Sequence, residues 1–303
     1  MATVPMTLRA LAAALLLCMG ASLAQAAPAD APASFDRGSV YVYTPSNAAR
    51  LDRPLQVVFA LHGMGGEGRG FCQGFLNAAE RNGWVIVAPT FSYRNWKDPV
   101  VVAEDDVALT QALVELLDSM PQRVGHATSK RAILFGFSRG AQLAHRFALA
   151  YPERTSAVAA MSAGTYTLPR ALSREAGGEP LNFPYGTADL GRRVGHAADG
   201  AALTRVPFWI AVGGEDDRAD DVPRQWDILL GKTRLQRADA FAQALNASGA
   251  LATLDIYPAL GHVMSAEMIR GATAFMEKAV AAERAAGPAA PPGEYRLVGQ
   301  IAY

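Results

Sequence analysis

Runs of apolar residues alternate along this chain with segments in which apolar and polar positions are mixed as in amphipathic helices. The apolar runs predict β-strands at residues 39–43, 55–61, 84–89, 132–135, 157–161, 206–212 and 252–257. The run at 55–61 is almost uninterrupted, which is typical of a parallel strand covered by helices on both faces. Helical segments are expected at about 69–81, 104–120, from 139 to about 151, 235–247 and 267–284. This alternation predicts an α/β fold of three layers, with a mostly parallel central sheet and helices on both faces.

One long segment, residues 166–205, breaks this rhythm. It contains Gly and Pro and shows no clear strand or helix pattern. A segment of this length within a domain usually serves function, so we interpret it as a lid-like insertion. The chain shows no internal repeat and no linker in its middle. We therefore expect one catalytic domain, residues 37–286, that carries the insertion.

The two ends of the chain have a different character. Residues 1–26 resemble a signal peptide, with Arg9, an apolar stretch and the small-residue cleavage pattern Ala24-Gln25-Ala26. The apolar stretch is short for a bilayer span, although an uncleaved anchor is the alternative. Residues 27–36 are expected to form a flexible leader, and residues 287–303 a Pro/Ala linker with a tail. The protein is thus predicted to be exported, to the periplasm or the medium, with no stable membrane span after cleavage.

Composition narrows the classes of function. Of the 303 residues half are hydrophobic, and 28 basic side chains balance 28 acidic ones, so no general attraction to nucleic acid is implied. Of the two cysteines, Cys18 lies in the signal segment and leaves Cys72 alone, which excludes an internal disulfide after cleavage. Neither H-E-x-x-H nor C-x-x-C occurs, so we expect no metal and no cofactor.

The segment that follows the predicted strand at 132–135 carries candidate chemistry. It reads Gly136-Phe137-Ser138-Arg139-Gly140 and leads directly into a helical pattern. A serine on a tight strand-to-helix turn needs small residues two positions to either side, because a Cβ there collides with the backbone. This Gly-x-Ser-x-Gly motif in its strand–turn–helix setting resembles the nucleophile elbow of the α/β-hydrolase superfamily.

The resemblance implies partners for Ser138. In that superfamily an acid and then a histidine follow the nucleophile, each on a loop after a strand. His262 follows the last predicted strand, and we expect it to be the general base. For the acid, counting three residues from Gly213 gives Asp216 and counting from Gly214 gives Asp217; we favour Asp216.

The loop after the strand at 55–61 reads His62-Gly63-Met64-Gly65-Gly66. Backbone N–H groups must stabilise the negative oxygen that forms during acyl transfer. One donor is expected from Arg139, next to the nucleophile, and the resemblance implies Met64 as the other. A phosphate-binding loop is the alternative, but the chain has no Walker lysine there.

Together these motifs look most like secreted esterases grouped with poly(3-hydroxybutyrate) depolymerases and feruloyl-esterase-like enzymes. Arg139 departs from the smaller residue of many relatives, and we hypothesise that its charge favours acidic substrates. The candidate substrate-binding residues are Gly65 and the aromatic Tyr166, Tyr185 and Trp226, with Tyr93, Trp96 and Phe183 as further aromatic candidates. For each aromatic residue the alternative is a packed side chain of the lid.

The sequence therefore predicts a serine hydrolase that cleaves a small-molecule or oligomeric carboxylic ester through an acyl-enzyme intermediate. Two alternatives remain open. A serine peptidase of the prolyl-oligopeptidase type uses the same machinery, although the chain has no room for the large extra domain usual in that family. A non-catalytic binding protein on the same fold is the other.

Overall fold

The computed structural model describes residues 35, 39–174, 177–197 and 199–286. The expected signal peptide, all but one residue of the leader, and residues 287–303 lie outside this part of the chain, so the expectations for them stay predictions. In the described part, no helix is long and apolar enough to cross a membrane.

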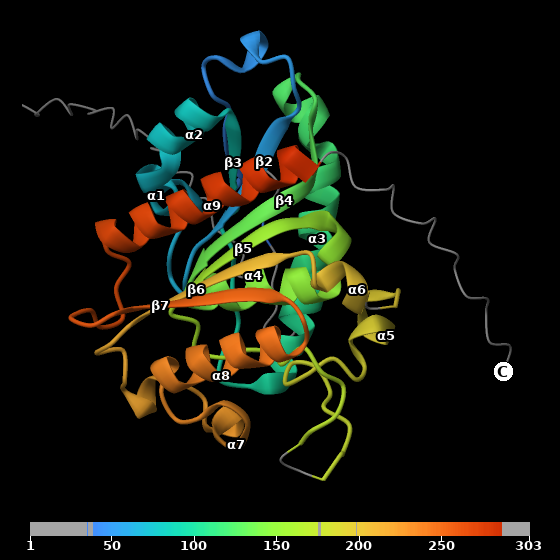
Figure 1. The fold of residues 1–303 in the computed structure, drawn as a ribbon, viewed down its shortest axis with the longest axis vertical. Helices are drawn as coiled ribbons and strands as arrows, with labels where there is room; N and C mark the ends of the chain where they lie inside the picture. Colours follow the sequence, from blue (N-terminus) through green and yellow to red (C-terminus); the bar gives the residue numbers. More distant parts are fainter. Residues whose placement is uncertain (1–34, 36–38, 175–176, 198, 287–303) are drawn as a thin grey trace, which may run out of the picture. The chain divides into compact units, whose positions relative to one another are not determined.

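The strands form a single sheet, as the apolar runs predicted (Figure 1). Along the sheet they follow the order β1-β3-β2-β4-β5-β6-β7, and only the pairing of β1 with β3 is antiparallel. The strands are β1 (Tyr41–Tyr43), β2 (Leu55–Leu61), β3 (Trp84–Ala88), β4 (Thr128–Phe137), β5 (Thr155–Met161), β6 (Pro207–Gly213) and β7 (Leu251–Tyr257). Every residue of β2, β3 and β5 is buried, which explains why these strands read as mostly apolar runs.

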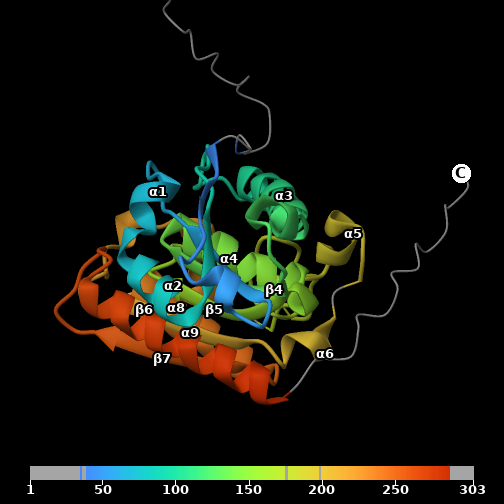
Figure 2. The same cartoon turned by 90° about the horizontal axis from the view of Figure 1, so that it is seen from above.

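Helices cover both faces of the sheet, which confirms the predicted three-layer architecture. They are α1 (Gly68–Phe71), α2 (Leu76–Asn82), α3 (Pro99–Val124), α4 (Arg139–Ala150), α5 (Leu190–Val194), α6 (Gly200–Leu203), α7 (Asp227–Leu230), α8 (Arg234–Ala247) and α9 (Ala266–Ala286). Figure 1 shows α9 crossing the face nearest the viewer, and Figure 2 shows α3 on the opposite side of the sheet.

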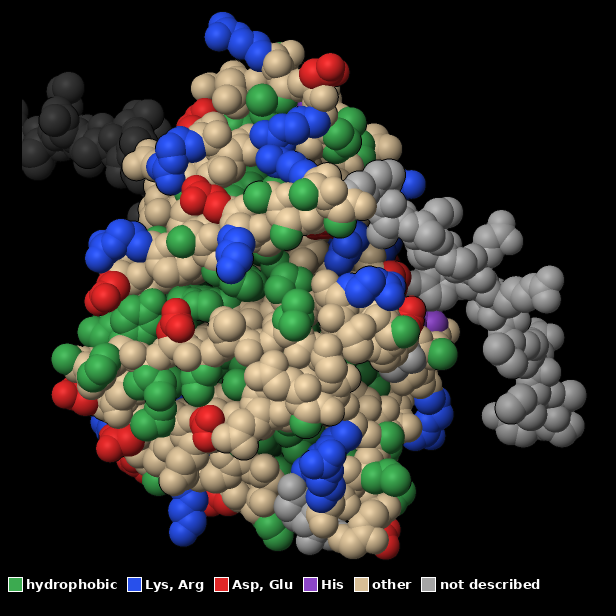
Figure 3. Space-filling model, in the orientation of Figure 1, with side chains coloured by type: hydrophobic (Ala, Val, Ile, Leu, Met, Phe, Trp, Pro, Cys, Tyr) green, Lys and Arg blue, Asp and Glu red, His purple; other side chains and the backbone are tan. Residues whose placement is uncertain are grey.

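Two apolar clusters hold these layers together. In α9 the buried residues Met268, Ala272, Met276 and Val280 recur every four positions and pack, with α2, on one face of the sheet. On the other face, α3, α4 and α8 contribute Leu113, Phe147 and Phe241 among others. On the outer surface of the α9 side, basic and acidic side chains are interspersed, in keeping with the balanced charge of the chain (Figure 3).

The structure corrects the predicted helix at 69–81. The segment instead forms α1, a 3-10 turn (Gln73–Phe75) and α2. Glycines weaken a continuous helix here, and Gly74 lets this turn lie close to α9, since a Cβ on it would stand 3.0 Å from Cδ1 of Ile269. Helix α3 begins earlier than expected, at Pro99, because the side chain of Asp98 caps it by accepting from the N–H of Val100.

The segment 166–205 packs beside the sheet against α4 and α8. The ring of Tyr166 stacks on Phe241 of α8 at 4.5 Å between centroids, and the N–H of Thr167 donates to Nε2 of His145 in α4. Short helices α5 and α6 lie within this segment. The segment is therefore a well-packed insertion, although its sequence shows no strand or helix periodicity.

Candidate active site

Ser138 sits on the sharp turn between β4 and α4, with φ 55° and ψ −116°. A positive φ is strained for a residue with a Cβ, and the surroundings must enforce it. They do so through contacts on both sides: the N–H of Ser138 donates to the carbonyl of Met161 at the end of β5. A Cβ on Gly140 would stand 1.8 Å from the carbonyl oxygen of Leu61, so only glycine fits there. The elbow geometry expected from the motif is present.

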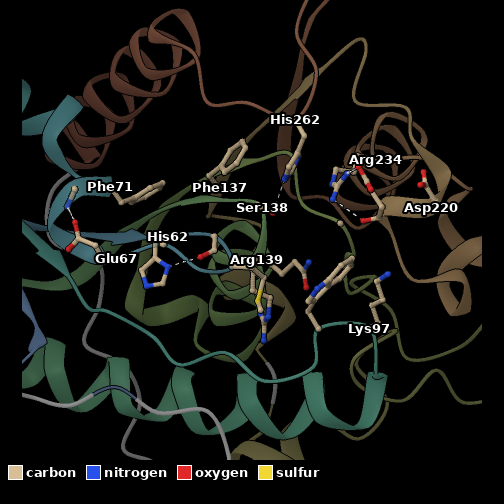
Figure 4. Close-up of a pocket in the computed structure, with 18 residues that line it drawn as sticks. His62, Glu67, Phe71, Lys97, Phe137, Ser138, Arg139, Asp220, Arg234 and His262 are labelled. Carbon is tan, nitrogen blue, oxygen red and sulfur yellow. Dashed lines mark hydrogen bonds and ion pairs between the residues drawn. The ribbon is translucent and has the colours of Figure 1, made fainter. Parts of the chain in front are cut away.

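Three side chains that are far apart in the sequence form one hydrogen-bonded chain. The Oγ of Ser138 lies 3.0 Å from Nε2 of His262 (Figure 4). Nδ1 of His262 lies 2.8 Å from Oδ2 of Asp216. A carboxylate only accepts, so Nδ1 carries a proton and Nε2 is left to accept from the serine hydroxyl when the ring is neutral. The ring of Phe137 stacks on the imidazole at 4.9 Å and fixes its plane.

The loops that carry Asp216 and His262 are tied to each other. The N–H of Glu215 donates to the carbonyl of Leu260, and the N–H of Gly214 to that of Tyr257. A Cβ on Gly213 would stand 2.1 Å from the oxygen of Leu260, so this glycine permits the close approach. The structure thus brings Asp216, and not the exposed Asp217, to the histidine.

Asp216 is almost fully buried and has a second partner. Nη1 of Arg234 donates to Oδ1 of Asp216 at 3.0 Å. Burial by itself would raise the pKa of Asp216, but the hydrogen bond from His262 and the positive charge of Arg234 outweigh it and lower the pKa. Arg234 is a site residue that sequence reasoning missed, because it lies in a different element from the motifs and its side chain carries no local signal.

The loop expected to supply an oxyanion donor lies directly against the elbow. A Cβ on Gly63 would stand 3.2 Å from the Cβ of Ser138. His62 braces this loop: its Nε2 accepts from the N–H of Phe91 at 2.9 Å, so its Nδ1 carries the proton and donates to the carbonyl of Gly63 at 2.7 Å. Burial lowers the pKa of His62, which keeps the ring neutral.

The two expected oxyanion donors, Met64 and Arg139, both line the cavity next to Ser138. Arg139 is the first residue of α4, so its N–H has no acceptor within the helix. No hydrogen bond uses the N–H of Met64 within the described residues. Gly65 itself does not line the cavity, so the expectation that it contacts substrate is not supported.

The side chain of Arg139 does not serve the role suggested by its charge. It is 1% exposed, its Nη2 donates to Oδ1 of Asp106 at 2.6 Å, and its guanidinium lies over the ring of Tyr93. Asp106 also accepts from Arg146 at 2.6 Å. The hypothesis that Arg139 presents a positive charge to acidic substrates is therefore wrong, because this charge is neutralised inside the core.

A cavity of about 670 Å³ opens beside Ser138. Phe71 and Phe137 lie to one side of Ser138, with Glu67 near Phe71, whereas the charged Lys97, Asp220 and Arg234 form a polar wall on the other side (Figure 4). Of the aromatic candidates, Trp96 lines the cavity.

The other aromatic predictions are corrected. Tyr166 and Trp226 are fully buried and joined by a hydrogen bond from the indole N–H to the Tyr166 carbonyl, and Tyr185 packs on Trp226. None of the three lines the cavity, nor does any other described residue of segment 166–205. These aromatic side chains hold the insertion against the core instead of contacting substrate.

No protein-family model matches this sequence, and no curated protein is significantly similar to it. Solved structures are similar in fold. A poly(aspartic acid) hydrolase-1 from Sphingomonas sp. KT-1 has a TM-score of 0.58 and 21% identity, over 79% of this chain and 91% of that one. Esterase PE8 has a TM-score of 0.54 and 18% identity, over 82% and 99%. An S-formylglutathione hydrolase from Agrobacterium tumefaciens has a TM-score of 0.51 and 21% identity, over 80% and 88%. These likenesses show that the chain has the α/β-hydrolase fold.

Proposed function

We propose that the protein is a serine hydrolase that cleaves carboxylic esters through an acyl-enzyme intermediate. The observation that supports this most strongly is the hydrogen-bonded chain from Ser138 through His262 to Asp216, with distances of 3.0 and 2.8 Å. A serine hydroxyl is a weak nucleophile at neutral pH and needs a base within hydrogen-bond reach and a carboxylate that orients this base. The fold neighbours described above include esterases.

In the acylation step, Nε2 of His262 removes the proton of Ser138 while Oγ attacks the ester carbonyl carbon. The imidazolium that forms is stabilised by Asp216, which stays ionised because its pKa is lowered. Collapse of the tetrahedral intermediate breaks the bond to the alcohol oxygen, and Nε2 returns the proton to this leaving group. In the second half, water attacks the acyl-serine with His262 again acting as the base.

The negative oxygen of each tetrahedral intermediate would accept from the N–H groups of Arg139 and Met64. The arrangement supports this assignment because both residues line the cavity and border Ser138. Backbone donors held by a helix start and by the loop that His62 braces need no reorganisation when the charge develops. A donor lost from such a site typically costs two to three orders of magnitude in kcat, or about 3–4 kcal/mol.

A direct test uses Ser138→Ala with 4-nitrophenyl butyrate. We expect the purified wild-type protein to release 4-nitrophenol with a burst, and kcat to fall at least about 1,000-fold in the variant. A fluorophosphonate probe should add one mass adduct on Ser138. Activity retained in Ser138→Ala would reject Ser138 as the nucleophile. Failure of the probe to label an intact protein would favour the non-catalytic alternative, and preferential cleavage of peptides would favour the peptidase.

We also propose that residues 1–26 direct export and are removed before Ala27, which leaves residues 37–286 as the catalytic domain. The pattern Ala24-Gln25-Ala26 supports this. Expression of the full chain in a bacterial host, followed by determination of the N-terminus of the periplasmic protein, tests it. An N-terminus at Met1 in a membrane fraction would indicate an uncleaved anchor.

A further inference from the structure

Two side-chain N–H donors converge on the polar wall of the cavity, next to Gly164. Nε2 of Gln142 lies 3.3 Å, and Nε of Arg234 lies 3.9 Å, from the point where a Cβ on Gly164 would stand. Gln142, Gly164 and Arg234 all line the cavity that contains Ser138. Both donor side chains are more than nine-tenths buried. Cγ1 of Val222 lies 3.6 Å from the same point, so the two donors and one methyl group surround the place that a side chain on Gly164 would take.

The orientation of the Gln142 amide is fixed by its neighbours. Arg146 has only donors, and its Nη2 donates to Oγ1 of Thr165 at 2.8 Å. The hydroxyl of Thr165 must therefore give its own proton to Oε1 of Gln142, 3.0 Å away. The amide oxygen is thus used in the core, and Nε2 is left with its two protons. Nε2 has no hydrogen-bond partner among the described residues.

Arg234 also carries an N–H donor without an acceptor. Its Nη1 donates to Asp216 and its Nη2 to the carbonyl of Asp221, but its Nε is buried without a partner in the described part of the chain. A buried N–H with no acceptor costs free energy, which an incoming acceptor would recover. Both residues line the cavity, so such an acceptor is most simply part of the substrate.

The charges around Arg234 determine whether a neutral or an anionic substrate group is the better acceptor for these donors. The carboxylate of Asp216 lies 3.0 Å and that of Asp221 lies 4.0 Å from its Nη1. Two carboxylates already surround one guanidinium, so a third anion would be repelled. A neutral carbonyl oxygen carries partial negative charge and accepts from both donors without this cost.

We propose that Gln142 Nε2 and Arg234 Nε form a subsite for a second, neutral carbonyl group of the substrate, beside the ester that Ser138 attacks. This inference rests on the proposed ester hydrolysis. It assigns the substrate to esters that carry a further keto, amide or ester carbonyl a few bonds from the scissile one. The cavity is large enough for such a substrate.

The experiment compares matched esters with and without the second carbonyl. On the acyl side, 4-nitrophenyl hexanoate is set against its analogues with a keto group at carbon 3, 4 or 5, and on the alcohol side, butyl acetate against 3-oxobutyl acetate. For the wild-type protein we expect kcat/KM to rise about tenfold for at least one keto ester over its parent. The charged 4-nitrophenyl glutarate half-ester should not share this gain.

Two variants remove the subsite in different ways. Gln142→Met deletes the amide donor at similar length, and Gly164→Ala places a methyl group 3.3 Å from Nε2. In both, the keto preference should fall below about twofold, whereas Phe71→Leu on the opposite wall should keep it. Circular dichroism spectra and thermal unfolding midpoints show whether each variant is folded. If Gln142→Met does not fold, the keto preference of the wild type and its loss in Gly164→Ala still test the proposed subsite.

The outcomes separate the two proposals. If the plain hexanoate and acetate esters are not cleaved, the proposed ester hydrolysis is rejected, and the proposed subsite, which rests on it, is rejected too. If they are cleaved but no keto ester is preferred, or if the preference survives both variants, the subsite is rejected while ester hydrolysis stands. A preference for the glutarate half-ester over every keto ester would also overturn it, in favour of an anion site.

Discussion

Arg234 and His262 bind opposite oxygens of the same carboxylate: Nη1 of Arg234 donates to Oδ1 of Asp216 and Nδ1 of His262 donates to Oδ2. The side chain of Asp216 is therefore fixed in rotation, and its charge is held by a permanent cation. A fixed carboxylate keeps the imidazole in the orientation that leaves Nε2 facing Ser138. Arg234 thus acts as a positioning residue for the proposed reaction, through Asp216.

Arg234→Met should lower kcat/KM at neutral pH by about 10- to 100-fold, the range expected for one lost hydrogen bond to a charged group. The loss relative to the wild type should grow as the pH falls, because Asp216 takes up a proton more readily without the cation. A pH profile with 4-nitrophenyl butyrate measures both. Arg237 is equally buried on the same helix but pairs with Asp227, so Arg237→Met should leave the acidic limb in place.

The lowered pKa of Asp216 also has a consequence for stability. Its ionised form contributes stability that is complete above the unfolded-state pKa of about 3.9 and is lost as the pH falls through the lower folded pKa. Arg234→Met removes part of this contribution. The difference in the free energy of unfolding between wild type and variant should therefore shrink from pH 6 to pH 3, as measured by urea titration. An uncharged core variant, Phe241→Leu, should show a constant difference.

Asp216→Asn should reduce kcat by about 10³- to 10⁴-fold, because an amide at this position no longer stabilises the imidazolium and can present the wrong hydrogen-bonding partner to Nδ1. Asp217→Asn is the matched control, since this neighbouring carboxylate is exposed and makes no contact with His262 in the described structure. Steady-state kinetics on one ester compares them. A larger loss in Asp217→Asn would reverse the assignment.

Much of the architecture was readable from local patterns. Buried parallel strands such as β2 gave continuous apolar runs, and the Gly-x-Ser-x-Gly spacing predicted the elbow because sterics at Gly136 and Gly140 leave no other choice. The order of Ser138, an acid and His262 followed from the resemblance. Each of these features depends on a short sequence pattern or on the order of residues along the chain, so it can be predicted from the sequence alone.

The parts that were missed depend on contacts between distant segments. Trp226 and Tyr166 are aromatic residues in irregular segments, which looks the same in a sequence whether the ring faces a ligand or a core. The charge of Arg139 appeared available because its partner, Asp106, is 33 residues away. Arg234 was overlooked for the same reason: its role exists only once α8 meets the loop after β6.

The tight packing around Gly140 in the elbow predicts a large loss of stability when a side chain is added there. Gly140→Ala places a Cβ 1.8 Å from the backbone oxygen of Leu61, and the next nearest atoms are also backbone, of Leu61 and His62, so no side-chain movement relieves the contact. We expect this variant to lose at least about 3 kcal/mol of stability or to fail to fold. Gly200→Ala is the control, because a Cβ there meets nothing within 4 Å, and it should change stability by less than about 1 kcal/mol. Urea unfolding curves followed by tryptophan fluorescence provide the comparison.

The buried cluster behind the elbow contains one carboxylate between two guanidinium groups. Asp106 is fully buried and accepts from Arg139 and Arg146, which are themselves at most 1% exposed. Asp106→Asn removes the ion-pair partner of two buried cations and should cost about 3–5 kcal/mol. Arg139→Met removes one cation and leaves one pair intact, so it should cost less than Asp106→Asn although it deletes a larger polar group.

The surface pair of Asp118 with Arg154 serves as the control, and Asp118→Asn should lower the free energy of unfolding by less than about 1 kcal/mol. Free energies of unfolding for the three variants should follow this ranking; an Arg139→Met variant less stable than Asp106→Asn would mean that packing, and not charge balance, dominates this cluster.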